Sequence, residues 1–247
     1  MKRILAFLLA TLLIVSLAKG QGFEEDYIQT DQGELKITFI KHGSLMFKYN
    51  NKIMHVDPVL RMGDYNKLPK ADLILITHHH GDHFDLNAIH KLNKKNTRII
   101  VTPKCVEMSE ELETPIVMKN GGTRAIKGFM IKAVPAYNIK HKRANGDPYH
   151  IKGEGNGYVI MIGGKKIYVA GDTENIQEMN NLKNIDIAFL PMNLPYTMTP
   201  KMVADAVEMI QPKVIYPYHF GNTNTLELVD LLRDNEKVEV RIRDMGF

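Results

Sequence analysis

The sequence predicts an α/β protein with four layers, an αββα sandwich in which two β-sheets pack face to face and helices cover their outer surfaces. An internal repeat supports this fold class. The chain repeats one plan in its two halves, a hairpin followed by a strand, a helix and a further strand. Such a unit leaves an apolar sheet face uncovered, which a second copy of the unit can bury. The 247 residues, 44% of them hydrophobic, suffice for one large core, so we predict a single domain over residues 21–247.

A hairpin opens each repeat. Residues 45–57 have the pattern of a strand, a polar turn and a second strand, and they end at Asp57. Residues 158–172 follow the same plan and end at Asp172. The two turns consist of Asn-Asn and Gly-Gly, residue types that accept the positive φ of tight hairpin turns. We therefore expect two hairpins with a carboxylate at the end of each.

The first hairpin is followed by the elements of a crossover. An apolar segment at residues 73–76 predicts a buried strand, and residues 85–94 predict a helix with Asp85 as its N-cap. A further strand is predicted at residues 98–101. Cys105 comes shortly afterwards; it is the only cysteine, so no intrachain disulfide can form, and we interpret it as a small buried hydrophobic residue.

The second half repeats this crossover. Strands are predicted at residues 187–190 and 213–216, with a helix at 200–210 between them. Thr199 is the expected N-cap, Pro200 suits the first helical position, and apolar residues recur on one helical face. The elements predicted beyond this crossover are a helix at residues 225–232 and a strand at residues 238–242.

One loop has the composition of a metal site. Thr77-His78-His79-His80-Gly81-Asp82-His83 directly follows the buried strand of the first half and places four imidazoles and a carboxylate within six positions. In an extended strand end, His78 and His80 project to the same side and can share one ion. Asp82 and His83 can face a second ion as the chain turns toward the helix. The alternative is a solvated, histidine-rich turn, which the further donors downstream argue against.

This motif, His-x-His-x-Asp-His after a hydrophobic strand, resembles the metallo-β-lactamase fold superfamily. Within it, the chain is most similar to the metal-dependent hydrolases that include ascorbate-phosphate lactonase-like and N-acylphosphatidylethanolamine phospholipase D-like proteins. The other matching segments occur in the family's order from about residue 35 to the C-terminus: residues 40–45, 56–58, 136–138, 168–173 and 217–219. The αββα sandwich predicted from the internal repeat is the fold of this family.

The resemblance implies a role for each donor. The implied ligands of the first ion are His78 and His80, and those of the second are Asp82, His83 and His219, with Asp172 bridging both ions. One ligand is left open, because Asn138 stands where many relatives have histidine. His150 and His141 are the alternatives, of which we favour His150; if neither binds, the site holds a single ion.

The metals imply the chemistry. Two ions sharing a water lower its pKa toward ~7, and the resulting metal-bound hydroxide would attack an ester, a lactone or a phosphodiester. Asp82 is expected to orient this hydroxide. His42 is expected to contact the substrate or to support a neighbouring ligand, and Asp57 to support a ligand histidine. Zn²⁺ is the expected metal, although Mn²⁺ or Fe²⁺ fits the same donors. The expected partner is a small-molecule substrate.

Three other functions are considered. A metal-binding protein of the same fold without turnover would keep the same ligands. A β-lactamase of this fold would carry a cysteine ligand in the second half, where this chain has Asp172. A di-iron redox relative would have glutamate where this chain has His80. The complete ligand set favours the hydrolase.

The N-terminus predicts export. Lys2 and Arg3 precede an apolar run at residues 4–17, and Ala18-Lys19-Gly20 is a small-x-small cleavage pattern. Residues 1–20 therefore resemble a secretory signal peptide, and we expect a periplasmic or secreted protein with no stable membrane anchor after cleavage. The apolar run is short for a spanning helix, which needs ~20 residues, so an uncleaved anchor is the less favoured alternative.

The charge of the mature chain is close to neutral. Residues 1–20 contain three basic residues and no acidic one, which leaves 29 of the 32 basic residues against 28 acidic ones, a net charge of +1. The sequence also shows no basic stripe. We therefore expect no nucleic-acid partner, and the sequence does not predict the oligomeric state.

Overall fold

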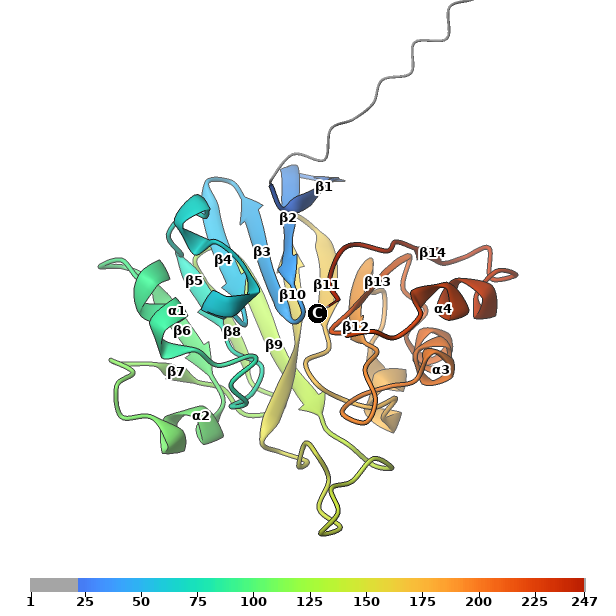
Figure 1. Ribbon diagram of the computed structural model, residues 1–247. Helices are drawn as coiled ribbons and strands as arrows, with labels where there is room; N and C mark the ends of the chain where they lie inside the picture. Colours follow the sequence, from blue (N-terminus) through green and yellow to red (C-terminus); the bar gives the residue numbers. More distant parts are fainter. Residues whose placement is uncertain (1–21, 247) are drawn as a thin grey trace, which may run out of the picture.

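The computed structural model describes residues 22–246, so the predicted signal peptide lies outside the described residues. Two seven-stranded sheets pack face to face, and helices lie on their outer surfaces (Figure 1). The predicted αββα sandwich is confirmed. Within residues 22–246, no helix combines the length and the apolar character needed to cross a membrane.

The first half of the chain builds the first sheet, with its strands in sequence order. They are β1 (Glu24–Thr30), β2 (Gly33–Lys41), β3 (Ser44–Tyr49), β4 (Lys52–Val56), β5 (Leu73–Leu75), β6 (Arg98–Val101) and β7 (Ile116–Val117). β1 to β4 pair antiparallel and β4 to β7 pair parallel. The helical elements of this half are η1 (Leu60–Met62), η2 (Tyr65–Lys67), α1 (Leu86–Leu92) and α2 (Pro103–Met108).

The second half repeats this arrangement. Its strands are β8 (Thr123–Ile126), β9 (Phe129–Ala136), β10 (Gly155–Ile162), β11 (Lys165–Val169), β12 (Ile187–Pro191), β13 (Val214–Tyr218) and β14 (Glu239–Val240). β8 to β11 pair antiparallel and β11 to β14 pair parallel. The helical elements are η3 (Gln177–Asn181), α3 (Pro200–Ile210) and α4 (Thr225–Leu231).

The register shows that the two hairpin carboxylates are not equivalent. The backbone N–H of Asp57 donates to Leu75 O at 2.9 Å, and that of Ala170 donates to Phe189 O at 3.1 Å. These bonds occupy matching places in the two sheets, so the counterpart of Asp57 is Ala170. Asp172 lies two residues further along the chain.

Aromatic side chains from both sheets fill the space between them. The ring of Phe39 lies 5.0 Å from that of Tyr216, and Phe47 packs edge-on against Phe189 with centroids 5.9 Å apart. Burying a side chain of this size contributes ~1.5–3 kcal/mol. Two further apolar clusters lie on the outer faces, beneath α1 and α3. The central layer thus joins the two halves into one body.

The helix caps agree with the sequence, whereas some boundaries differ. The side chain of Asp85 accepts from two N–H groups of α1, and Thr199 accepts from Met202 N in α3. Cys105 is buried, as predicted. The strand predicted at residues 238–242 shrinks to the two residues of β14, because this edge strand pairs only with β13. Helix α2 and strand β1 were not predicted.

Candidate metal centre

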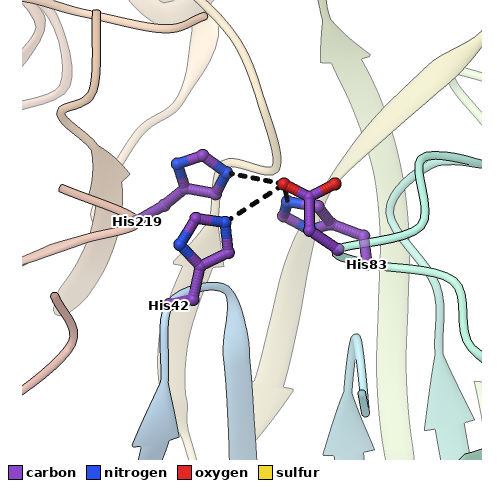
Figure 2. A group of neighbouring side chains, drawn as sticks. His42, His83 and His219 are labelled. Carbon is purple, nitrogen blue, oxygen red and sulfur yellow. Dashed lines mark hydrogen bonds and ion pairs between the residues drawn. The ribbon is translucent and has the colours of Figure 1, made fainter. Parts of the chain in front are cut away.

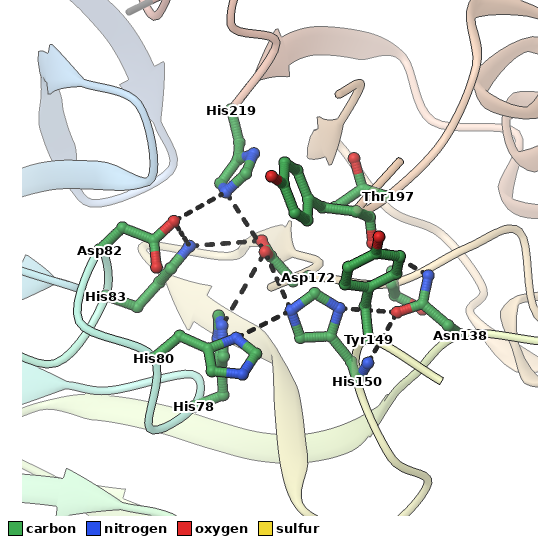
Figure 3. Close-up of polar contacts among 12 residues, drawn as sticks. His78, His80, Asp82, His83, Asn138, Tyr149, His150, Asp172, Thr197 and His219 are labelled. Atoms are coloured by element: carbon green, nitrogen blue, oxygen red, sulfur yellow. Dashed lines mark hydrogen bonds and ion pairs between the residues drawn. The ribbon is translucent and has the colours of Figure 1, made fainter. Parts of the chain in front are cut away.

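The predicted ligands meet at one rim between the two sheets (Figure 3). They lie in the loop after β5 (His78, His80, Asp82 and His83), just before β10 (His150), after β11 (Asp172) and after β13 (His219). Donors that are far apart in the sequence therefore converge where strands end, as is usual for sites in α/β proteins.

Glycine makes two of these positions possible. Gly171, directly before Asp172, has φ +64°, and a Cβ there would lie 2.7 Å from the backbone oxygen of Asn156. A Cβ on Gly43 would lie 2.6 Å from His83 Cε1. Any larger residue at these two positions would displace Asp172 or His83.

The first group of donors consists of His78, His80 and His150, whose ligand atoms lie within 4.8 Å of one another. His80 Nδ1 is 3.1 Å from His150 Nε2. His150 Nε2 in turn lies 3.3 Å from Asp172 Oδ2, and His78 Nε2 lies 3.9 Å from the same oxygen.

The second group consists of His42, Asp82, His83 and His219. Figure 2 shows the three imidazoles converging from separate elements. His219 Nε2 lies 3.7 Å from Asp82 Oδ2 and 3.2 Å from Asp172 Oδ2. His42 Nε2 lies 3.2 Å from Asp82 Oδ2. The buried carboxylate of Asp172 therefore reaches donors of both groups.

Asp57 lies behind two of these imidazoles. Its carboxylate accepts from His83 Nδ1 at 2.7 Å, and from the N–H and the hydroxyl of Thr77 at 2.7 and 2.5 Å. Because the Thr77 hydroxyl donates to Asp57, its oxygen is left to accept from His78 Nδ1, 3.0 Å away. One carboxylate thus leaves the Nε2 lone pairs of both His78 and His83 directed at the rim, as second hydrogen-bonding partners of ligand histidines commonly do.

Asn138 supports His150 in the same manner. Its Oδ1 accepts from His150 Nδ1 at 2.7 Å and from His150 N at 2.9 Å. Its Nδ2 donates to Glu174 Oε1 and to the backbone oxygen of Tyr196, which fixes the orientation of the amide. His150 Nε2 is therefore the nitrogen that faces the rim.

These contacts distinguish the three open alternatives for the remaining ligand. The structure brings His150 into the first group. Asn138 lies behind His150, and the Nδ1 of His141 lies 2.9 Å from Glu174, outside both groups. His79, in the same loop as His78 and His80, belongs to neither group.

The electrostatics of the two groups differ. Burial lowers the pKa of His78 well below its usual value, and burial together with His150 lowers that of His80 to about 4. Burial would also lower the pKa of His219, but Asp172 and Asp82 outweigh it and raise the value to about 10. Burial opposes ionisation of Asp172, yet His219 and His83 hold its pKa well below the usual range.

The donors fit divalent metal ions. Burial would lower the pKa of His83, but Asp172 and Asp57 outweigh it and raise the value. When His83 is neutral and its Nδ1–H donates to Asp57, its Nε2 lone pair faces Asp172 Oδ1 at 3.4 Å. His150 does the same toward Asp172 Oδ2. Two acceptors so close repel each other unless a positive charge lies between them. Within residues 22–246, His78 Nε2, His83 Nε2 and Asp172 Oδ1 have no hydrogen-bond partner. Imidazole nitrogens and carboxylate oxygens are the donors that zinc and related ions take.

A cavity of about 950 Å³ opens over both groups. Its floor includes Asp172, His150 and His219, and its walls include Arg61 of η1 and Arg143 of the loop between β9 and β10. A volume of this size accommodates a small-molecule ligand.

Comparisons with known proteins agree with this fold. A β-lactamase superfamily domain matches residues 36–219, well over half of the chain. The chain therefore belongs to the metallo-β-lactamase superfamily. It is 31% identical over 207 residues to a UPF0173 metal-dependent hydrolase of Pelotomaculum thermopropionicum, covering 79% of this chain and 87% of the relative. The family to which it belongs is thus one of metal-dependent hydrolases.

Solved structures give the same result. A protein from Parabacteroides distasonis assigned to the metal-dependent hydrolases is 48% identical, with a TM-score of 0.85, and the match covers 90% of this chain and 99% of that one. A metallo hydrolase from Ignicoccus hospitalis is 23% identical, with a TM-score of 0.71 over 86% of this chain and 96% of that one. The second comparison supports the fold alone.

Sequence reasoning expected Asp57 to support a ligand histidine, but it missed the supporting roles of Asn138 and Glu174. Glu174 follows Asp172 by two positions and accepts the backbone N–H groups of Ile139, Lys140 and His141. It thereby holds the loop that carries Asn138. The signal available was an acidic residue beside a predicted ligand. The two arginines of the cavity wall were also overlooked.

Proposed function

We propose that this chain is a hydrolase with two divalent metal ions, zinc by preference, that cleaves an ester, a lactone or a phosphodiester. The observation that carries the proposal is that Asp172 lies within reach of both donor groups. Bound at such a site, two ions lower the pKa of a water toward ~7 and polarise the bond that is cleaved.

Each donor group would hold one ion. His78, His80 and His150 would bind the first, Asp82, His83 and His219 the second, and Asp172 would contribute to both. Asp57 and Asn138 keep the Nδ1 protons of their partner histidines in place, so that the Nε2 lone pairs remain available.

His42 would position Asp82. Burial lowers the pKa of His42 to about 4, so this imidazole is neutral near pH 7. Its Nε2 proton then donates to Asp82 Oδ2, 3.2 Å away. Because His42 also lines the cavity, it is placed to contact substrate beside the carboxylate it orients.

The test combines metal analysis with a substrate panel. We expect two equivalents of zinc per chain and zinc-dependent cleavage of at least one of three probes: 4-nitrophenyl acetate, an aryl lactone and bis(4-nitrophenyl) phosphate. Chelation should abolish the turnover, zinc should restore it, and His80→Ala should remove it. If both metal sites are occupied but none of these probes and no cephalosporin is cleaved, the protein would be a metal-binding protein without turnover. Turnover that persists without metal would contradict the proposal.

We also propose that residues 1–20 direct export of the protein to the periplasm or beyond. The support is the basic start, the apolar run and the cleavage pattern in the sequence. N-terminal sequencing of exported protein should begin near Gln21 or Gly22. An intact Met1 would contradict cleavage.

A further inference from the structure

The cavity wall carries a distinct charge. Apart from Asp82 and Asp172 of the candidate metal centre, the residues lining the cavity include no carboxylate within the described part of the chain. They do include two guanidinium groups, those of Arg61 and Arg143. Among the described residues, those that line the cavity outside the metal centre therefore carry only positive charge.

Arg143 is held in place by its own loop. Its N–H donates to Asp147 O at 2.7 Å, and its carbonyl accepts from Gly146 N at 2.9 Å, which closes a tight turn. The guanidinium lies over the Tyr149 ring, 5.0 Å from its centroid, and donates to the Tyr149 carbonyl at 3.3 Å. Tyr149 packs edge-on against Tyr196 at 5.1 Å. These contacts orient the guanidinium without neutralising its charge.

Position links this guanidinium to the metal centre. Tyr149, whose ring lies beneath the Arg143 guanidinium, directly precedes His150 in the sequence. The guanidinium is therefore held next to a ligand of the first group. Arg61 belongs to η1 and comes from the other half of the molecule. The two guanidinium groups thus belong to walls built by different halves.

We propose that the cavity selects substrates with an anionic group separate from the bond that is cleaved, and that Arg143 binds this group. Arg61 lines the same cavity from the other half of the molecule. A guanidinium binds carboxylate or phosphate through paired N–H donors. The cavity has room for a molecule that spans the metal centre and the arginine. This inference rests on the proposed function, because it names the substrate class of the same site.

The test uses pairs of esters that differ only in a remote charge. The mono-4-nitrophenyl esters of succinic, glutaric and adipic acid keep a free carboxylate at three distances from the scissile bond, and their methyl esters are neutral. We expect zinc-loaded wild-type protein to show a KM at least tenfold lower for one of the acids than for its neutral partner. A tenfold ratio corresponds to about 1.4 kcal/mol.

Substitution assigns the effect to the arginine. In Arg143→Gln, the KM for the preferred acid should rise to that of its methyl ester, so that the ratio of the two KM values approaches one. Arg61→Gln should cause a smaller rise. Lys142→Gln is the matched control, because Lys142 is exposed on the same loop but does not line the cavity. Equal KM values for acid and ester at all three lengths, or an unchanged ratio in Arg143→Gln, would overturn the inference.

A binding measurement separates this inference from the proposed function. Calorimetry with the corresponding 4-nitroanilides, acid against methyl ester, compares affinities without requiring ester cleavage. Tighter binding of the acid that is lost in Arg143→Gln would support the anionic site even if no ester is cleaved, in which case only the hydrolase proposal would fail. Equal binding of acid and ester in the wild-type protein would overturn the anionic site while leaving the hydrolase proposal intact.

Discussion

Two carboxylates from the two halves of the molecule approach the same pair of imidazoles from opposite sides. Asp57 lies behind them, bonded to His83 Nδ1 and, through the hydroxyl of Thr77, connected to His78 Nδ1. Asp172 lies in front, 3.4 and 3.9 Å from the Nε2 atoms of the same two histidines. The acid in the first half therefore orients imidazoles, whereas the acid in the second half faces the cavity with them.

The difference arises from position along the strand. By register, the counterpart of Asp57 is Ala170, and Asp172 follows two residues later, after the positive-φ turn at Gly171. Asp57 is fully buried and closed off by Thr77. A duplicated fold thus delivers two similar strand ends to one rim, and an offset of two residues decides what each acid can contact.

The largest effect is expected for Asp172→Asn, which tests whether the acid in front serves both donor groups. The amide removes a negative charge shared by the two groups, so both ions should be lost or weakened. Turnover should fall by ~10³-fold, the equivalent of several kcal/mol of transition-state stabilisation. Metal analysis and initial rates on the preferred ester would measure both. If the variant retains two equivalents of zinc and its rates lie within tenfold of wild type, Asp172 does not serve both donor groups.

The next effect concerns which second-half histidine completes the first group. His150→Ala should remove one of the two zinc equivalents, because the His150 Nε2 faces the rim beside His80 and Asp172. His141→Ala is the matched control on the same loop and should retain both, since its ring lies against Glu174. Metal occupancy by emission spectrometry decides this. Loss of zinc in the His141 variant alone would reverse the assignment.

Substitution of the supporting residues should have intermediate effects on metal affinity, and the variants should differ in whether one ion or both are weakened. Asp57→Asn should weaken both ions, because Asp57 orients His83 directly and His78 through Thr77. Loss of such a partner typically costs 10–100-fold in metal affinity. Breaking the buried Asp57–His83 pair should also reduce the free energy of unfolding by ~3–5 kcal/mol.

Asn138→Ala is the comparison variant for Asp57→Asn. It should weaken only the first ion, because Asn138 contacts His150 and no second-group donor within residues 22–246. Stepwise titration of the metal-free proteins with Co²⁺, followed by visible absorption, resolves the two ions without an activity assay. If both variants weaken both ions equally, Asn138 does not act on the first ion alone, contrary to what its hydrogen bonds indicate.

The contiguous part of the site could be predicted from the sequence, and the dispersed part only in outline. Residues 77–83 follow a recognisable strand, so local spacing sufficed to place four donors. Asp172 and His219 were assigned through a family resemblance. The choice between Asn138, His141 and His150 depended on where an intervening loop returns to the sheet, and the hydrogen bonds of the Asn138 amide decide that.

The fold shows the same limit. The hairpins, crossovers and helix caps follow from local patterns, so the four layers and the caps at Asp85 and Thr199 were predictable. The two-residue offset between Asp57 and Asp172 was not, because register depends on backbone pairing between strands. The short edge strand β14 was overestimated because an apolar alternating pattern does not show how much of it will find a partner.

The smallest expected effect concerns pH and a second pair of matched positions, His55 and Tyr168. Each lies two residues before its matched position, Asp57 or Ala170, and both are fully buried. Burial lowers the pKa of His55 to about 4 and raises that of Tyr168 above its ordinary value. Folding therefore requires both groups to be neutral.

The sign follows from proton binding. Below about pH 6.5 the unfolded chain protonates His55 while the folded chain does not, so stability falls as pH drops toward 4, by ~3 kcal/mol at most. Above about pH 10 the unfolded chain loses the Tyr168 proton first, so stability falls there as well. Urea unfolding of metal-free protein should show a shallower acid limb in His55→Gln and a shallower alkaline limb in Tyr168→Phe. An acid limb unchanged in His55→Gln would show that other groups govern acid stability.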